Sequence, residues 1–227
     1  MVYVTGDTHG DLRRFSSPAM RRLRAGDTLI ICGDFGFLWD GSKREKKALE
    51  KLKKLKYTIL FVDGVHENYE MLAGYPIGAF QGAQAQQIAD NIWHLLRGEV
   101  YTIEGETYFA FGGGEEEAEA EIRDAARTRW EQQMPSEDEM KRGLLHLLEH
   151  GRRVNYIVTH SPSGKTSGLL AARTHQPVRL GGLHVYLNQL EDALTFDRWF
   201  FGSLHLDKPI SKRHLAVFEQ VVPVRDV

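Results

Sequence analysis

Residues 2–10 read VYVTGDTHG, a short apolar run that ends in a glycine followed by an aspartate and a histidine. Residues 28–34 (TLIICGD) and 58–64 (TILFVDG) repeat this pattern further along the chain. Runs of this length that are rich in Val, Ile and Phe predict buried β-strands. Residues 11–24 and 43–56, which lie between the runs, have helical character. Because strands and helices alternate, we predict a right-handed, mostly parallel sheet.

The second half of the chain predicts further strands. Residues 99–112 (EVYTIEGETYFAFG) alternate around a Glu-Gly turn, which is typical of a β-hairpin. Residues 155–160 (NYIVTH) and 198–205 (RWFFGSLH) are again apolar runs, and residues 213–224 are expected to form a closing pair of strands. These segments indicate a second sheet. We therefore predict an α/β fold with a two-sheet core and helices outside.

The composition is that of one globular domain. The chain has 227 residues, of which 42% are hydrophobic and 26% charged, so it is long enough for one well-packed core. The formal net charge of -2 gives no overall attraction to nucleic acid or to membranes. The single cysteine, Cys32, excludes an internal disulfide and fits a reducing compartment. Because we find neither a signal peptide pattern nor an apolar run near the roughly 18 residues that cross a bilayer, we expect a cytoplasmic protein.

One biased segment interrupts this domain. Residues 115–124 read EEEAEAEIRD. We predict that they belong to a surface insertion around residues 114–135 of a single domain that spans residues 1–227. A helix is expected to begin directly after the insertion, because Ser136 and Glu139 have the spacing of a capping box.

Six residues with metal-binding or acid–base side chains follow the predicted strands: Asp7, His9, Asp34, His66, His160 and His205. Ligand sites in sheets with parallel strands gather at the carboxyl ends of those strands, so these residues are expected to converge. Singly, each has a simpler interpretation, as a helix cap or as a hydrogen-bonded core histidine. Together they predict a metal site, and a mixed set of carboxylates and imidazoles suits Mn, Fe or Zn.

The blocks GDTHG, GDFGFLW, GVHEN, THSP and GSLH, in this order from Gly6 to Asp207, resemble the calcineurin-like metallophosphoesterases. The resemblance is closest to small bacterial and phage-like members whose third block reads GNHEN. In those proteins an Arg-Gly pair and a Gly-Gly pair follow, here Arg97-Gly98 and Gly112-Gly113. The resemblance implies a four-layer α/β/β/α sandwich, in which two mixed sheets are flanked by helices and two metal ions are bound.

The resemblance also implies roles for individual residues. One metal ion would be bound by a set of four ligands, Asp7, His9, Asp34 and His205. A second ion would share Asp34 and add His160. His66 would protonate the leaving oxygen or stabilise the phosphate. Arg97 either contacts the phosphate or is an ordinary surface residue.

Two positions depart from the family pattern. Val65 stands where GNHE has its asparagine, and Ser203 stands where GHxH has its first histidine. Both missing ligands belong to the second metal ion. We therefore predict one firmly bound divalent ion, Mn before Fe, Zn or Mg, and a second ion that is weakly bound or absent. The predicted function is hydrolysis of a phosphomonoester or phosphodiester, with a phosphorylated small molecule as one class of substrate. The alternative is a catalytically degenerate protein that binds a phosphorylated ligand or regulates a partner.

Two further stretches allow functional interpretations that we do not favour. The basic residues from Lys43 to Lys56 could contact nucleic acid, but Lys-rich surface helices are common and a solvated helix face is the better interpretation. The acidic run in the predicted insertion also counts against a nuclease, since it would repel a phosphodiester backbone. Phe37 and Trp39, which follow Asp34, are expected in the core.

Overall fold

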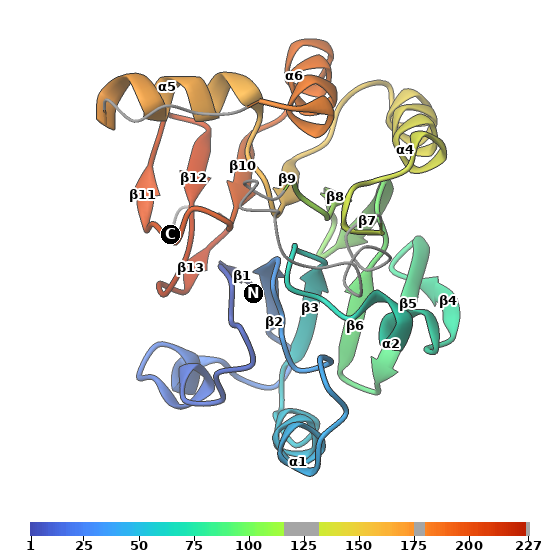
Figure 1. Ribbon diagram of the computed structural model, residues 1–227, viewed down its shortest axis with the longest axis vertical. Coiled ribbons are helices and arrows are strands. Elements are labelled where there is room, and N and C mark those ends of the chain that lie inside the picture. The colour runs from blue at the N-terminus through green and yellow to red at the C-terminus, as the bar shows by residue number, and fades with distance from the viewer. Residues whose placement is uncertain (116–131, 175–179, 226–227) are drawn as a thin grey trace, which may run out of the picture.

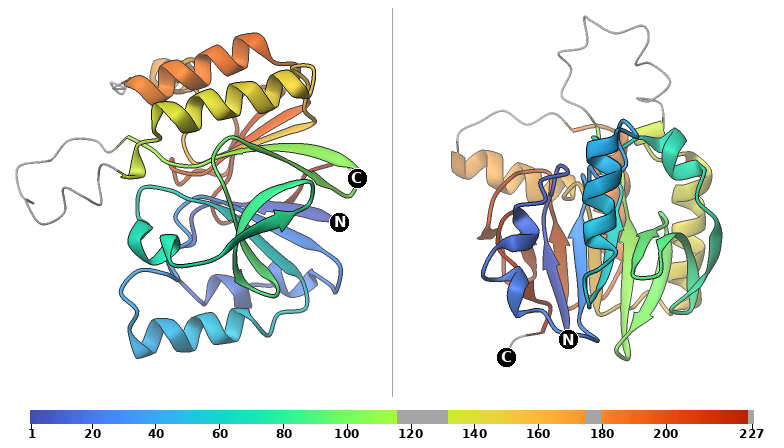
Figure 2. Two further views of the ribbon diagram at one scale, coloured as in Figure 1. Left: turned by 90° about the vertical axis from the view of Figure 1, so that its right-hand side faces the viewer. Right: turned by 90° about the horizontal axis from the view of Figure 1, so that it is seen from below.

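A computed structural model describes residues 1–115, 132–174 and 180–225. Over these residues two β-sheets pack face to face, with helices on the outer side of each (Figures 1 and 2). The predicted four-layer α/β/β/α arrangement, with two mixed sheets, is therefore confirmed. None of the described helices combines the length and the hydropathy that a membrane crossing requires.

The first sheet has the order β13-β1-β2-β3-β6-β5-β4. Its four central strands are parallel, as predicted for the first three apolar runs. Both edges are antiparallel, through β13 on one side and through β5 and β4 on the other. The strands are β1 (Val2–Thr5), β2 (Thr28–Cys32), β3 (Thr58–Val62), β4 (Ile77–Phe80), β5 (Ala83–Ala89), β6 (Ile92–Leu95) and β13 (Val222–Pro223).

The second sheet has the order β11-β12-β10-β9-β8-β7. Its inner strands β12, β10, β9 and β8 are parallel, and β11 and β7 are antiparallel edges. The strands are β7 (Glu99–Ile103), β8 (Glu106–Phe111), β9 (Tyr156–Thr159), β10 (Arg198–Phe201), β11 (Lys208–Pro209) and β12 (His214–Ala216).

Helices cover the outer face of each sheet (Figure 2). The 3₁₀ turns η1 (Arg14–Ser16) and η2 (Met20–Arg22) and helix α1 (Lys43–Leu52) cover the first sheet, and α2 (Tyr69–Ala73) follows β3. Helices α4 (Glu137–Glu149), α5 (Gly164–Thr174) and α6 (Gly182–Ala193) lie beyond the second sheet.

Side chains that alternate along the strands build three apolar layers. In β2, Ile30 and Cys32 face the space between the sheets, where they pack with Val158 of β9. Leu29, their neighbour in the same strand, points the other way and packs in one cluster with Leu52 of α1. This two-residue period is what the pleat of a strand imposes. It explains how an uninterrupted apolar run supplies two layers of the core at once.

Two local predictions are confirmed. The hairpin of residues 99–112 turns at Glu104 and Gly105, whose φ angles of 52° and 80° match the left-handed turn that suits twisted hairpins. The capping box is also present, because the Ser136 side chain accepts from the Glu139 amide and the Glu139 side chain accepts from the Ser136 amide.

Two other predictions made from the sequence are wrong. Residues 11–24 form short 3₁₀ turns instead of a helix, because Pro18 has no amide hydrogen and disfavours helical backbone at Ser17, which is extended. Residues 213–224 form two strands that do not pair, since β12 joins the second sheet and β13 the first. Asp207 turns the chain between them by accepting hydrogen bonds from the amides of residues 218–220. Most of the predicted insertion, residues 116–131, lies outside the described residues.

Candidate metal centre

The loops after β1 and β2 bring the first three predicted ligands to one edge of the first sheet. The amides of Thr8 and His9 both donate to the carbonyl of Asp34, at 3.1 and 2.8 Å. His9 and Asp34 have φ angles of 46° and 44°, a left-handed conformation that turns each loop sharply. Asp7, which directly precedes this contact, is buried. Backbone hydrogen bonds therefore join the two loops that position these ligands.

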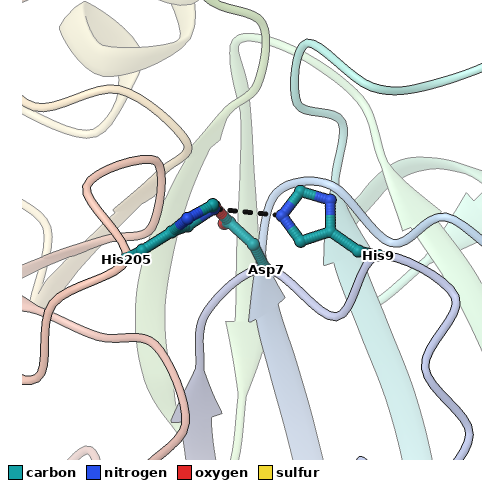
Figure 3. Close-up of side chains that lie close together, drawn as sticks. All are labelled: Asp7, His9 and His205. Carbon is teal, nitrogen blue, oxygen red and sulfur yellow. Dashed lines mark hydrogen bonds and ion pairs between the residues drawn. The ribbon is translucent and has the colours of Figure 1, made fainter.

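The second sheet contributes two histidines to the same place. His160, which follows β9, is buried, with Nδ1 3.5 Å from Asp7 Oδ1 and Nε2 3.9 Å from Asp34 Oδ1. His205, which follows β10, places Nε2 3.1 Å from Asp7 Oδ2 and 3.0 Å from His9 Nε2. Figure 3 shows the rings of His9 and His205 on either side of the Asp7 carboxylate.

His66 completes what we call the histidine cluster, which consists of Asp7, His9, Asp34, His66, His160 and His205. The amide of His66 donates to Asp34 Oδ1 at 2.8 Å, and its ring Nδ1 lies 2.9 Å from Asp34 Oδ2. The His66 side chain is 60% exposed, whereas that of Asp34 is 2% exposed. His66 is thus held by a buried carboxylate while its ring reaches solvent.

Three overlapping groups in the cluster could each bind a metal ion, because their ligand atoms lie within 4.8 Å of one another. The groups are Asp7, His9 and His205; His9, Asp34 and His66; and Asp7, Asp34 and His160. The third group contains Asp34 and His160, the two ligands that the sequence predicts for a second ion, together with Asp7.

The atoms present fit a divalent cation. Asp7 Oδ2 is buried and has no hydrogen-bond donor, since His205 approaches it without the geometry of a hydrogen bond. Two donors that each lie about 2.1 Å from one ion, at octahedral or tetrahedral angles, are about 3.0–3.4 Å apart. The 3.0 Å between His9 Nε2 and His205 Nε2 and the 3.1 Å between His205 Nε2 and Asp7 Oδ2 fall in this range.

Electrostatics keep both carboxylates ionised. Burial opposes the charge on Asp34, but His160 and hydrogen bonds from His66 lower its pKa well below the usual range. The pKa of Asp7 is lowered in the same way, against burial, by His160 and His205. Burial lowers the pKa of His9, which favours the neutral ring with a lone pair for a metal ion. Burial also acts against a charge on His160, yet Asp34 and Asp7 raise its pKa to about 10.

The two departures from the family pattern both lie against this centre. The space above Gly114 is bounded by Val65 Cγ1, Ser161 Oγ and His160, which would lie 2.6, 3.1 and 3.3 Å from a Cβ atom placed there. Val65 therefore presents a methyl group beside His160. The backbone amide of Ser203 points at the centre, with a contact of 3.3 Å to Asp7 Oδ1. Neither residue supplies an imidazole or a side-chain amide.

Arg97 does not join the histidine cluster, and its predicted contact with phosphate has no support in the structure. Its guanidinium is buried and donates to Asp63 Oδ2 from Nε at 2.9 Å and from Nη2 at 2.6 Å. Nη1 donates to Glu139 at 3.2 Å, and Nη2 also reaches the carbonyls of Gln132 and Gln133. Arg97 is not an ordinary surface residue either. Its partners are distant in sequence, which is why the Arg-Gly motif alone could not reveal this role.

Two supporting residues escaped the sequence analysis. Glu67 is buried, and its Oε1 accepts from the Phe35 amide at 2.6 Å, which holds the loop after Asp34. Arg14 donates to the Asp7 carbonyl at 2.8 Å and lies over the Phe218 ring, which in turn stacks on His205. Only the position of Glu67 in GVHEN could have pointed to it, and no sequence signal marks Arg14.

Comparisons with known proteins agree with this geometry. A search of curated proteins found no match. The family model described as calcineurin-like phosphoesterase matches residues 1–206, a span that includes every residue of the histidine cluster. Proteins of this family typically bind divalent metal ions, and the candidate ligand groups of this chain fit that property. The chain therefore belongs to the calcineurin-like phosphoesterase family.

Proposed function

We propose that this protein is a metal-dependent phosphoesterase that acts on phosphomonoesters or phosphodiesters with one firmly bound divalent ion. The observation that carries the proposal is the convergence of side chains from both sheets on Asp7 Oδ2, a buried oxygen without a hydrogen-bond donor. A buried carboxylate oxygen that accepts no hydrogen bond is costly unless a cation compensates it.

The firm site consists of Asp7, His9, Asp34 and His205, and we assign it Mn, with Fe, Zn or Mg as alternatives on the same mixed donor set. When bound, a divalent ion stabilises negative charge on the phosphoryl oxygens and activates a water molecule for attack. A second ion would use the buried group of Asp7, Asp34 and His160. It would be held weakly, because Val65 offers no ligand atom there.

His66 is the proposed general acid. Its Nδ1 faces Asp34 at 2.9 Å, so the carboxylate orients the ring and stabilises its protonated form. With Nδ1 engaged, Nε2 carries the proton that is transferred to the leaving oxygen as the P–O bond breaks. This role requires access to substrate, which the exposed side chain provides.

A second candidate function is phosphate-ligand binding without turnover. Val65 and Ser203 favour it, because both replace ligands of the same ion and leave the firm site intact. The two candidates share metal binding and differ in hydrolysis. The cytoplasmic location expected from the sequence stays a prediction.

Hydrolysis of an aryl phosphate and of a bis-aryl phosphodiester tests the proposal. Each would be measured with Mn, Fe, Zn or Mg and compared with a metal-chelated sample. We expect turnover with at least one ion, and a decrease of about 100-fold or more in His66→Gln, since a general acid usually contributes about 100- to 10,000-fold. His150→Gln is the matched control, since His150 is exposed at the C-cap of α4. Absence of turnover with every ion would favour the binding function.

A further inference from the structure

A groove of about 1160 Å³ connects the histidine cluster to helix α1. Its walls include His9 and His66 of the cluster and a row of basic side chains from α1. The basic side chains of α1 are Lys43, Arg44, Lys47 and Lys51, and Arg13 also lines the groove. The helix that the sequence analysis interpreted as a solvated face therefore borders the candidate site.

The acidic residues of the groove are already engaged. Asp11 pairs with Arg13 through two oxygens, at 2.9 Å to Nε and 2.9 Å to Nη2. Glu45 accepts from the amides of residues 39–41, and Asp40 accepts from the Ser42 amide at 2.8 Å. These bonds hold the turn that leads into α1, so the acids face backbone groups or Arg13.

The cations of α1 have no such partners. In the part of the chain that the structure describes, no ion pair involves Lys43, Arg44, Lys47 or Lys51, and all four are exposed. Lys43, Lys47 and Lys51 are four residues apart, which places them along one side of the helix. At 1.5 Å per residue this row is about 12 Å long, more than one phosphate group can contact.

An aromatic side chain lies in the same groove. Trp39 was expected in the core, together with Phe37, but only Phe37 is buried. Trp39 is 39% exposed and lines the groove with both the α1 cations and His66. Exposed aromatic rings beside a row of cations are how proteins bind single strands, with bases stacked on the rings and phosphates on the cations.

We propose that this groove binds single-stranded nucleic acid, with phosphates along α1 and a base stacked on Trp39, and leads the strand toward His9 and His66. A strand suits the site better than a single nucleotide, because the cation row spans more than one phosphate and the groove exceeds the volume of an ordinary small-molecule pocket. That the strand is also the hydrolysed phosphodiester rests on the proposed function. Binding does not.

The test measures binding by fluorescence anisotropy of a labelled oligothymidylate, in the presence of a chelator so that no hydrolysis occurs. In Lys47→Gln/Lys51→Gln we expect the slope of log affinity against log salt concentration to decrease in magnitude by about 1.4. Each phosphate contact that is lost on a single strand accounts for roughly 0.7 of this change. Lys46→Gln/Lys54→Gln removes the same charge from exposed residues outside the groove and should leave the slope unchanged. Trp39→Ala should weaken binding about fivefold or more, and Trp39→Phe should retain most of it.

Inorganic polyphosphate serves as a competitor that has charge but no bases. Weaker competition than that of unlabelled oligothymidylate supports the proposal. Equal competition, together with unchanged binding by Trp39→Ala, would overturn it in favour of a general polyanion site. An equal slope change in the two lysine pairs, or no binding at low salt, would also overturn it. Because the assay contains no metal ion, its failure is distinct from a failure of the phosphoesterase proposal.

Discussion

The histidine cluster and the group around Arg97 are two sets of ionisable residues built around buried carboxylates at strand ends, and they differ in how their hydrogen bonds are satisfied. Around Arg97, the carboxylate of Asp63 receives two bonds from the guanidinium and one contact of 3.1 Å from His94 Nε2. His94 Nδ1 in turn lies 2.7 Å from the Gln86 side-chain oxygen. We call these four residues the Arg97 network, and each of its charges faces a partner.

In the histidine cluster, two ring nitrogens face each other at 3.0 Å and Asp7 Oδ2 lacks a donor. The comparison teaches that burial and charge do not by themselves identify a functional site. Polar atoms that lack hydrogen-bond partners and converge on one point do identify such a site, since native proteins pair nearly all other buried polar atoms.

The largest effect is expected in the Arg97 network. Arg97→Leu leaves Asp63 as an unpaired buried charge, which should lower the free energy of unfolding by about 3–5 kcal/mol. Denaturant unfolding would measure this loss, and Arg21→Leu, at an exposed position, should stay within about 0.5 kcal/mol of wild type. Turnover per folded molecule should be retained. A stable Arg97→Leu protein that has lost turnover would restore Arg97 to the active site.

A substitution in the histidine cluster should reduce metal binding and turnover more than it reduces stability. Asp7→Asn removes the carboxylate charge on which the proposed metal ligands converge, so we expect loss of bound metal and a decrease in turnover of at least about 100-fold, with a smaller change in stability than in Arg97→Leu. Elemental analysis and the aryl phosphate assay would measure both. The control is Asp90→Asn, at an exposed carboxylate. Normal metal content in Asp7→Asn would refute the assignment.

A gain of function tests the weak second site. Val65→Asn combined with Ser203→His restores both ligands that the family pattern contains, and it should raise turnover about tenfold, or about 1.4 kcal/mol in the activation barrier. The single variants should gain less, because each supplies one ligand. If the double variant is no more active than wild type, the lost ligands do not limit the reaction.

The two sites should also differ in how their stability depends on pH. The pKa of His160 rises from 6.5 to about 10 in the folded protein without metal, so its contribution to stability is complete below pH 6.5 and is lost as the pH rises toward 10. The Asp63 pKa is lowered by Arg97 and His94 against burial, so that contribution is present above the usual Asp pKa and is lost in acid. Unfolding with a chelator should show an alkaline limb that disappears in His160→Gln and an acid limb that disappears in Asp63→Asn. The reverse pattern would contradict these pairings.

Much of the fold could be predicted from the sequence, because buried parallel strands are continuous apolar runs that end at functional residues. The strands β4, β5 and β6 were missed because their sequences, IGAF, AQAQQIA and IWHL, are short or rich in glutamine and alanine. The division of the closing strands between the two sheets was also missed, since it depends on the turn held by Asp207. Strand pairing at the edges of a sheet is decided by such contacts and not by local pattern.

The strand-end ligands could be predicted in the same way, because both sheets deliver their carboxyl ends to one place. Arg97 and Trp39 could not. The Arg97 interpretation required knowledge that Asp63 and Glu139 surround the guanidinium. Trp39 is exposed because Glu45 holds its amide in the turn before α1, a contact that no short motif reveals.

The most direct test of the proposed metal centre is a Mn titration of the metal-free protein by calorimetry. We predict one tight equivalent in wild type, a second and weaker one at most, and no tight binding in Asp7→Asn. Two tight equivalents in wild type would contradict the effect assigned to Val65 and Ser203. Absence of tight binding, with Mn and with each alternative ion, would contradict the metal centre itself.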